Sequence, residues 1–208
     1  MSTPSSDIAF TPTIKALQAE RGSRANYQRM EERGGFRTEI TEDLAQFLAS
    51  VDTAYLATAN AAGQPYAQHR GGPKGFIRIV GPTTLGFADY RGNRQYITLG
   101  NLSENDRAYL FLIDFSRRQR IKLWGRARVV ENDDMLIAKL FDHGYKARPE
   151  RVILFTIEAW DVNCSQHITE RYTQGEVAMA FEGLRERIAE LEAENARLLA
   201  AQGAANRP

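Results

Sequence analysis

Arginine, glycine and aromatic residues are concentrated between Tyr66 and Asn101, so this stretch has the side chains to bind an anion. Residues 93–105 have helical spacing, and Arg94 would lie in the first turn of that helix. The first amides of a helix lack partners within it, and the helix dipole favours negative charge at that end. We therefore expect the start of this helix to bind an anion such as a phosphate.

Composition excludes several other classes of site. Lys and Arg number 27 against 26 Asp and Glu, a net charge of +1, so no surface for nucleic acid is predicted. Cys164 is the single cysteine, which excludes an internal disulfide and a zinc site built from cysteines; we expect no metal. The first residues, MSTPSSDIAF, lack a signal sequence, and no segment has the roughly 18 apolar residues of a membrane span. We expect a cytoplasmic protein without membrane contact.

The elements that must position this stretch are mostly strands. Residues 54–60, 65–70, 75–81, 84–90, 107–114, 120–131 and 151–160 are predicted strands separated by turns, with a short helix at 133–141. Strands in hairpin order favour an antiparallel sheet over a βαβ repeat. We predict a mainly β fold with peripheral helices, in which six or seven antiparallel strands form a closed or partly closed barrel.

Helical patterns precede the predicted barrel. Thr11 and Pro12 suit the cap and first residue of a helix that ends at Gly22, and the polar residues 21–35 favour a second helix. Another helix is predicted to begin at Thr41 and to pack on the sheet through an apolar stripe of Leu44, Phe47, Leu48 and Val51. We divide the chain into a helical arm (1–40), a barrel domain (41–175) and a C-terminal helix (176–208).

The C-terminal helix has the heptad pattern of a leucine zipper. Asn195 at an a position favours a parallel two-stranded coil, and Arg187 would face Glu192 of a second copy. We predict a coiled-coil helix that joins two chains; the alternative is a single amphipathic helix folded on the barrel. The a and d positions are Phe181, Leu184, Ile188, Leu191, Asn195, Leu198 and Gln202.

Three segments together resemble the pyridoxamine 5′-phosphate oxidase-like family of FMN-binding split barrels. They are the hairpin AYLATANAAGQPYAQHRGG, the strand-to-helix passage LGFADYRGNRQYITLGNLSENDRAYLFLID and the strand RIKLWGRARVVE. The resemblance covers about residues 42–170. It implies an antiparallel split β-barrel that forms a homodimer, binds FMN in clefts between the two barrels and acts on a small-molecule substrate.

The resemblance also implies which residues contact the flavin. Arginine can grip the dianionic phosphate of FMN with two hydrogen bonds, and the ring needs an apolar wall with nearby donors. The alternatives are that Arg70, Arg94, Arg120 and Lys122 are surface charges. By position, Asn93, Arg94 and Gln95 correspond to the phosphate site, and His69, Arg70, Phe76, Ile77, Arg78, Asp89, Tyr90, Arg120 and Lys122 to the strands around the flavin.

Four further residues are candidates for contact with the substrate or the second subunit: Trp124, Cys164, His167 and Arg171. A cysteine near a histidine is also the pairing of a nucleophile and its base, with a buried, unreactive cysteine as the alternative. The arginine- and tryptophan-rich C-terminal segment that the true oxidases use on the pyridoxal substrate is not recognisable. FMN binding is therefore better supported than oxidation of pyridoxamine 5′-phosphate.

Two functions follow from these patterns. The first is an FMN-dependent oxidoreductase that passes hydride or electrons between a reduced donor and a small substrate. The alternative is a non-catalytic dimer that binds a flavin or another cofactor for storage, sensing or assembly. A deazaflavin or haem in place of FMN also remains open.

Overall fold

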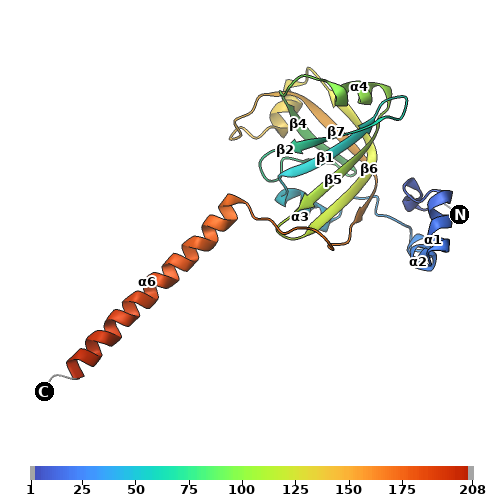
Figure 1. The fold of residues 1–208 in the computed structure, drawn as a ribbon. Coiled ribbons are helices and arrows are strands. Elements are labelled where there is room, and N and C mark those ends of the chain that lie inside the picture. The colour runs from blue at the N-terminus through green and yellow to red at the C-terminus, as the bar shows by residue number, and fades with distance from the viewer. Residues whose placement is uncertain (1–2, 206–208) are drawn as a thin grey trace. The chain divides into compact units, whose positions relative to one another are not determined.

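The computed structural model describes residues 3–205, and its main feature is one seven-stranded antiparallel sheet. The strand order is β2-β1-β5-β6-β7-β4-β3, and the sheet curls into a barrel (Figure 1). Because β2 and β3 are the two edges of the sheet, this is a split barrel, and the predicted fold class is confirmed. The strands are β1 (Thr53–Ala59), β2 (Pro65–Gly71), β3 (Arg78–Gly81), β4 (Thr84–Tyr90), β5 (Arg107–Asp114), β6 (Gln119–Val130) and β7 (Pro149–Val162).

Helices precede, interrupt and follow the strands, and two of them lie at opposite ends of the barrel, α3 (Glu42–Ser50) and α4 (Ile97–Glu104) (Figure 1). Two predicted caps are present: Thr11 accepts a hydrogen bond from the amide of Ile14, and Thr41 accepts one from the amide of Leu44. The remaining helices are η1 (Ser5–Ile8), α1 (Pro12–Glu20), α2 (Arg24–Glu32), α5 (Asp134–Leu140) and α6 (Gln174–Ala205).

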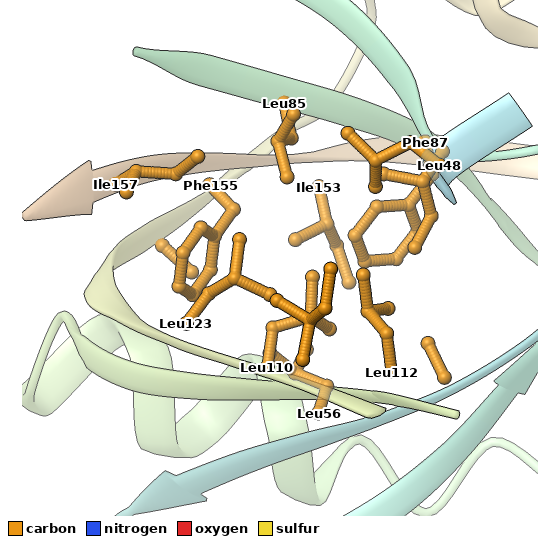
Figure 2. Packing of buried hydrophobic residues seen from close by; sticks show 14 of the residues in the cluster. Leu48, Leu56, Leu85, Phe87, Leu110, Leu112, Leu123, Ile153, Phe155 and Ile157 are labelled. Carbon is orange, nitrogen blue, oxygen red and sulfur yellow. The ribbon is translucent and has the colours of Figure 1, made fainter. Parts of the chain in front are cut away.

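Side chains that alternate between the inner and outer faces of the strands form the core of the barrel. Every second residue of β1, β5 and β6 points into the barrel, where leucine side chains from facing strands meet (Figure 2). The α3 stripe closes one end, and all four of its predicted residues are buried. The buried side chains at the centre include Leu48, Leu56, Leu85, Phe87, Leu110, Leu112, Leu123, Ile153, Phe155 and Ile157.

The outer surface of the barrel differs from one side to the other. Over β4 and β7, α5 covers the sheet, and Leu140 packs with Val152 and Leu154 in a second small core. The outer face of β2, β1, β5 and β6 instead carries an aromatic group, which we call the outer aromatic face: Tyr55, His69, Tyr109, Phe111 and Trp124. Ring centroids in this group lie 5.3–6.4 Å apart for Tyr109–Trp124, Tyr55–His69 and Tyr55–Phe111.

The segment after α2 attaches the N-terminal arm to the barrel. The ring of Phe36 stacks on Trp124 with centroids 5.1 Å apart, and Arg37 forms an isolated antiparallel bridge with Trp160. The indole nitrogen of Trp160, whose side chain is fully buried, donates a 2.7 Å hydrogen bond to the carbonyl of Glu39. The arm therefore belongs to the same compact unit as the barrel, which extends to Ile168.

The residues from Thr169 onward form a separate compact unit that contains α6. Across residues 3–205, no helix has both the length and the apolar character needed to cross a membrane.

We expect Gly125→Ala to destabilise the barrel. The sheet register shifts between Trp124 and Gly125, and a Cβ at position 125 would lie 2.0 Å from the carbonyl oxygen of Thr156. Relieving that clash must move the backbone, so urea titrations should show the free energy of unfolding reduced by about 1–3 kcal/mol or more. Gly100→Ala, in α4 with open space around the new methyl group, is the control and should be neutral or slightly stabilising. Equal stability of the two variants would contradict this account.

Candidate functional site

A cleft lies at the end of the barrel where α4 begins, between the edge strand β2 and strand β4. Its volume is about 60 Å³. That suits a phosphate-sized group but is well below the roughly 300 Å³ at which pockets for cofactor-sized ligands begin. The cleft is lined by Tyr66, Gln68 and Arg70 of β2, Asp89 and Tyr90 of β4, residues 92–99, and Glu150 and Arg151 of β7.

Two arginines and one aspartate form the floor of the cleft. Arg70 donates to the carboxylate of Asp89 in a short hydrogen bond, and Nη1 of Arg151 lies 3.8 Å from the second oxygen of the same carboxylate. The Asp89 residue is 6% exposed, and burial raises the pKa of its carboxyl group while both arginines oppose that rise. Because Arg70 lies on the edge strand and Asp89 on β4, the pair spans the opening of the barrel.

Both floor arginines keep a donor without a hydrogen-bond partner among the described residues. The Nε atoms of Arg70 and Arg151 are buried and unsatisfied. Arg151 also donates from Nη2 to Glu150 at 2.9 Å, and its Nε lies 3.4 Å from a carboxylate oxygen of Glu131 without hydrogen-bond geometry. Leaving such a donor unpaired is costly, and both guanidinium groups keep unused hydrogen-bonding capacity at the floor of the cleft.

The wall of the cleft corrects the sequence prediction for Arg94. Helix α4 begins at Ile97, so Arg94 precedes the helix instead of lying in its first turn. Arg94 and Tyr96 have positive φ angles of 62° and 57°. These angles lie in the left-handed region, which a right-handed α-helix does not contain. The Nε of Arg94 donates a 3.0 Å hydrogen bond to the Tyr96 hydroxyl, and no side chain caps the first amides of α4. Residues 97–99 at the start of α4 line the cleft, and an anion site at this helix start stays a prediction.

The structure brings six of the residues named from the sequence to this one cleft: Arg70, Asp89, Tyr90, Asn93, Arg94 and Gln95. Arg94 is exposed, whereas Arg70 and Asp89 are mostly enclosed. Tyr90 packs with Phe141 and Tyr145, and burial raises the pKa of its hydroxyl. The cleft thus combines an exposed cation at its edge with buried charges at its floor.

The residues predicted to lie beside the flavin ring are found in different parts of the barrel. His69 points away from the cleft, because successive residues of β2 face opposite sides of the sheet. Phe76 and Ile77 precede β3 and are buried in the core, so the prediction that they line the flavin site is not supported by their positions. Arg78, the first residue of β3, is exposed and is not part of the cleft lining.

Three other predicted residues lie on the outside of β6. The Nζ of Lys122 lies 2.9 Å from a carboxylate oxygen of Asp161 and 5.5 Å from the ring of Trp124. Arg120 donates from Nε to the carbonyl of Cys164 at 3.1 Å. They therefore belong to the outer aromatic face or its border, and the cleft of the same chain does not include them.

The residues after β7 do not form a catalytic group in this structure. Cys164 is exposed, which corrects the alternative of a buried cysteine, and its sulfur accepts a hydrogen bond from the amide of Gln166 at 3.5 Å. His167 is exposed with a positive φ of 60°, and no interaction between it and Cys164 is recorded. Arg171 belongs to the second compact unit.

Several cleft residues were not identified from the sequence. Gln68 accepts a 2.9 Å hydrogen bond from the hydroxyl of Thr98, which ties β2 to α4. Alternation along β2 could have identified Gln68, since it shares a face with Arg70. Arg151 also left a signal, because it is a charged residue at the start of an otherwise apolar predicted strand. The same alternation places Tyr66 on that face, whereas Tyr96 and Glu150 had no comparable signal.

The family model described as pyridoxamine 5′-phosphate oxidase matches residues 40–164, more than half of the chain. The chain belongs to this family. The match begins just before α3 and ends just after β7, so it covers the split barrel and the cleft. A comparison with curated proteins gives no match.

Solved structures with a similar fold include three from bacteria. HupZ of Group A Streptococcus is 20% identical, with 64% of this chain and 99% of that chain covered and a TM-score of 0.48. An FMN-binding protein from Syntrophomonas wolfei is 13% identical, with coverage of 70% and 97% and a TM-score of 0.46. General Stress Protein 26 from Bacillus anthracis is 18% identical, with coverage of 58% and 91% and a TM-score of 0.43.

Replacing Asp89 by Asn tests whether burial or the two arginines dominate its ionisation. Burial raises the folded-state pKa above the unfolded value of about 3.9, so Asp89 contributes stability that is present below that pH and is lost as pH rises through the folded-state pKa. Asn does not titrate. Urea titrations should therefore show the stability of the unchanged protein relative to Asp89→Asn falling as pH rises from about 4 to 7.

The control for this measurement is Asp106→Asn, which removes an exposed carboxylate 2.7 Å from Arg126. The stability difference caused by such a surface pair should be below about 1 kcal/mol. If the stability of the unchanged protein relative to Asp89→Asn instead increases with pH, the two arginines outweigh burial.

Proposed function

We propose that this protein is an FMN-dependent oxidoreductase that passes hydride or electrons between a reduced donor and a small substrate. The observation that carries the proposal is the cleft, in which two buried arginine Nε atoms have no hydrogen-bond partner among the described residues, beside Arg94 and the start of α4, which lacks a side-chain cap. Membership of the pyridoxamine 5′-phosphate oxidase family supports a flavin as the ligand.

The cleft fits the phosphate end of FMN. A phosphate dianion needs several donors, and Arg94 with the first amides of α4 provides them at the cleft edge. Below them, the two positive charges of Arg70 and Arg151 are matched by the carboxylates of Asp89 and Glu150. These residues would hold and orient the cofactor.

The flavin ring must lie outside this small cavity, which holds only about 60 Å³. In the family resemblance the flavin lies between two barrels, and the predicted contacts here fall on two separate surfaces of one chain. The cleft contains Arg70 and Arg94, whereas Arg120, Lys122 and Trp124 lie on the outside of β6. We infer that a complete site combines the cleft of one copy with the outer surface of another. When bound, FMN supplies the hydride-transfer chemistry.

The outer aromatic face is the surface we assign to the dimer. Tyr55 is 38% exposed at its edge, and Tyr109, Phe111 and Trp124 are half-buried. Burial within the single chain raises the pKa of the Tyr109 hydroxyl to about 12. On the other side of the barrel, α5 already covers the corresponding apolar surface. Phe36 stacks on Trp124 and covers that part of the outer aromatic face, and the remaining aromatic residues favour contact with a second copy.

The visible spectrum of the purified protein tests the cofactor. We expect FMN absorption that NAD(P)H or another reduced donor bleaches and that air restores. Bound FMN without turnover by any donor would instead support the alternative, a non-catalytic cofactor-binding dimer. A haem or deazaflavin spectrum would replace FMN in the proposal, and a colourless protein that does not take up added FMN would reject both flavin functions.

Arg94→Ala should weaken FMN binding by about 1.5–3 kcal/mol, the range for a hydrogen bond to a charged group. Fluorescence titration of FMN into protein freed of cofactor measures the dissociation constant. Arg29→Ala, which removes an exposed arginine from α2, is the control and should leave that constant unchanged. An unchanged constant for Arg94→Ala would reject the phosphate assignment.

Phe111→Glu should disrupt the barrel dimer and reduce FMN binding, because it buries a carboxylate at the centre of the proposed interface. FMN titration should show affinity reduced at least about tenfold, equivalent to 1.4 kcal/mol. Mass measurement by light scattering should show weaker association, and thermal unfolding should remain cooperative. Met135→Glu, on the exposed surface of α5, is the control. Retained association and unchanged FMN affinity with Phe111→Glu would show that the dimer uses another surface.

A further inference from the structure

Helix α6 is a long element with a defined start. It comprises 32 residues, Gln174–Ala205, and begins with a capping box. The amide of Glu176 donates to the hydroxyl of Thr173 at 3.2 Å, and the Glu176 carboxylate accepts from the amide of Thr173 at 2.8 Å. Most of the stability of a helix in a protein comes from packing of its apolar face, so we expect α6 to pack along one face.

That face is an apolar stripe with heptad spacing, and it is longer than the sequence prediction. Starting the helix at Gln174 adds one heptad, with Gln174 at a and Val177 at d, to those that begin at Phe181. The stripe therefore contains four heptads, one more than the three that begin at Phe181. The apolar stripe residues are all 41–60% exposed in the single chain: Val177, Phe181, Leu184, Ile188, Leu191 and Leu198.

We propose that α6 pairs with α6 of a second copy of this chain in a parallel, in-register, two-stranded coiled coil. Leucine occupies d at 184, 191 and 198, and β-branched Ile188 occupies a, the combination that favours two strands over three or four. The proposal concerns the second compact unit and does not rest on the flavin function or on the barrel interface.

Asn195 determines the orientation of the pair. In a parallel, in-register coil an a residue meets the same a residue of the second chain, so the two Asn195 amides can hydrogen-bond to each other. In an antiparallel coil an a residue packs against d residues, which here are valine and leucine. The Asn195 amide would then be buried without a partner, at a cost in stability.

The flanking charges agree with pairing between identical copies. At g and e, Arg187 of one chain would face Glu192 of the other, and the remaining in-register pairs, Ala180 with Arg185 and Glu194 with Leu199, contain no like charges. Within one chain Arg187 bonds Glu190 at 2.8 Å, but both side chains are more than 60% exposed, so this contact is weak and exchangeable. A parallel coil has a two-fold axis along its length, which closes the assembly at two chains.

Disulfide trapping in the full-length protein tests both pairing and orientation. Cys164, the only cysteine, is first replaced by serine, and Leu198→Cys is then introduced at a d position near the end of the stripe. In the parallel, in-register coil the two new thiols face each other, so mild oxidation should convert most of the protein into a covalent dimer. Ala193→Cys, at the outward f position of the same helix, is the control and should give little covalent dimer.

Three outcomes would overturn the proposal. Equal trapping at 198 and 193 would indicate random collision, and absence of trapping at 198 would show an antiparallel pair, a different partner or no partner. One cysteine per chain can link only two chains, so a larger bundle would appear instead as a native mass above two chains in light scattering. The Phe111→Glu measurement reports separately on the barrel interface, so failure of the proposed barrel interface and failure of the proposed coil are distinguishable.

Leu184→Asp, in the full chain, should lower the apparent dimer affinity, and unchanged affinity would also contradict the coil.

Discussion

The contact between Arg70 and Asp89 is the interaction on which the site depends. The sheet ends at β2 on one edge and at β3 on the other, so hydrogen bonding between strands leaves the barrel split. Arg70 on β2 and Asp89 on β4 bridge that split with opposite charges, and Arg151 of β7 adds a second cation to the same carboxylate. Burying these charges is expensive, and mutual pairing reduces the cost. The resulting floor carries two cations on one shared anion, with two Nε donors left over.

Strand alternation separates the two sets of candidate residues. Arg70 and Gln68 face inward at the barrel end, while His69, between them, joins the outer aromatic face. The same rule directs Lys122 and Trp124 outward from β6 as their neighbours enter the core. A single chain therefore cannot bring both sets to one ligand. In the dimer that we propose, each copy would offer its cleft to the outer face of the other.

Most elements of the fold could be predicted because their signals are local. Apolar alternation marked all seven strands, and Thr11 and Thr41 marked helix starts by the hydroxyl that caps them. The predicted start of α4 was too early because Arg94 and Tyr96 adopt left-handed conformations. Arginine and tyrosine rarely adopt such conformations, so the sequence did not predict them. The residue pattern assigned Phe76 and Ile77 to a strand, and the family resemblance assigned them to the flavin site, but both side chains are buried in the core.

The sequence by itself determined the antiparallel barrel, the family, the arginine at the cleft edge and the heptad stripe, because each depends on spacing along the chain. Only the tertiary structure decided which charges meet. Asp89 and Arg151 are 62 residues apart yet face each other in the β4–β7 register, and Arg70 reaches them across the split. The partners of a buried charge are set by strand register and barrel closure, neither of which is encoded at a fixed sequence separation.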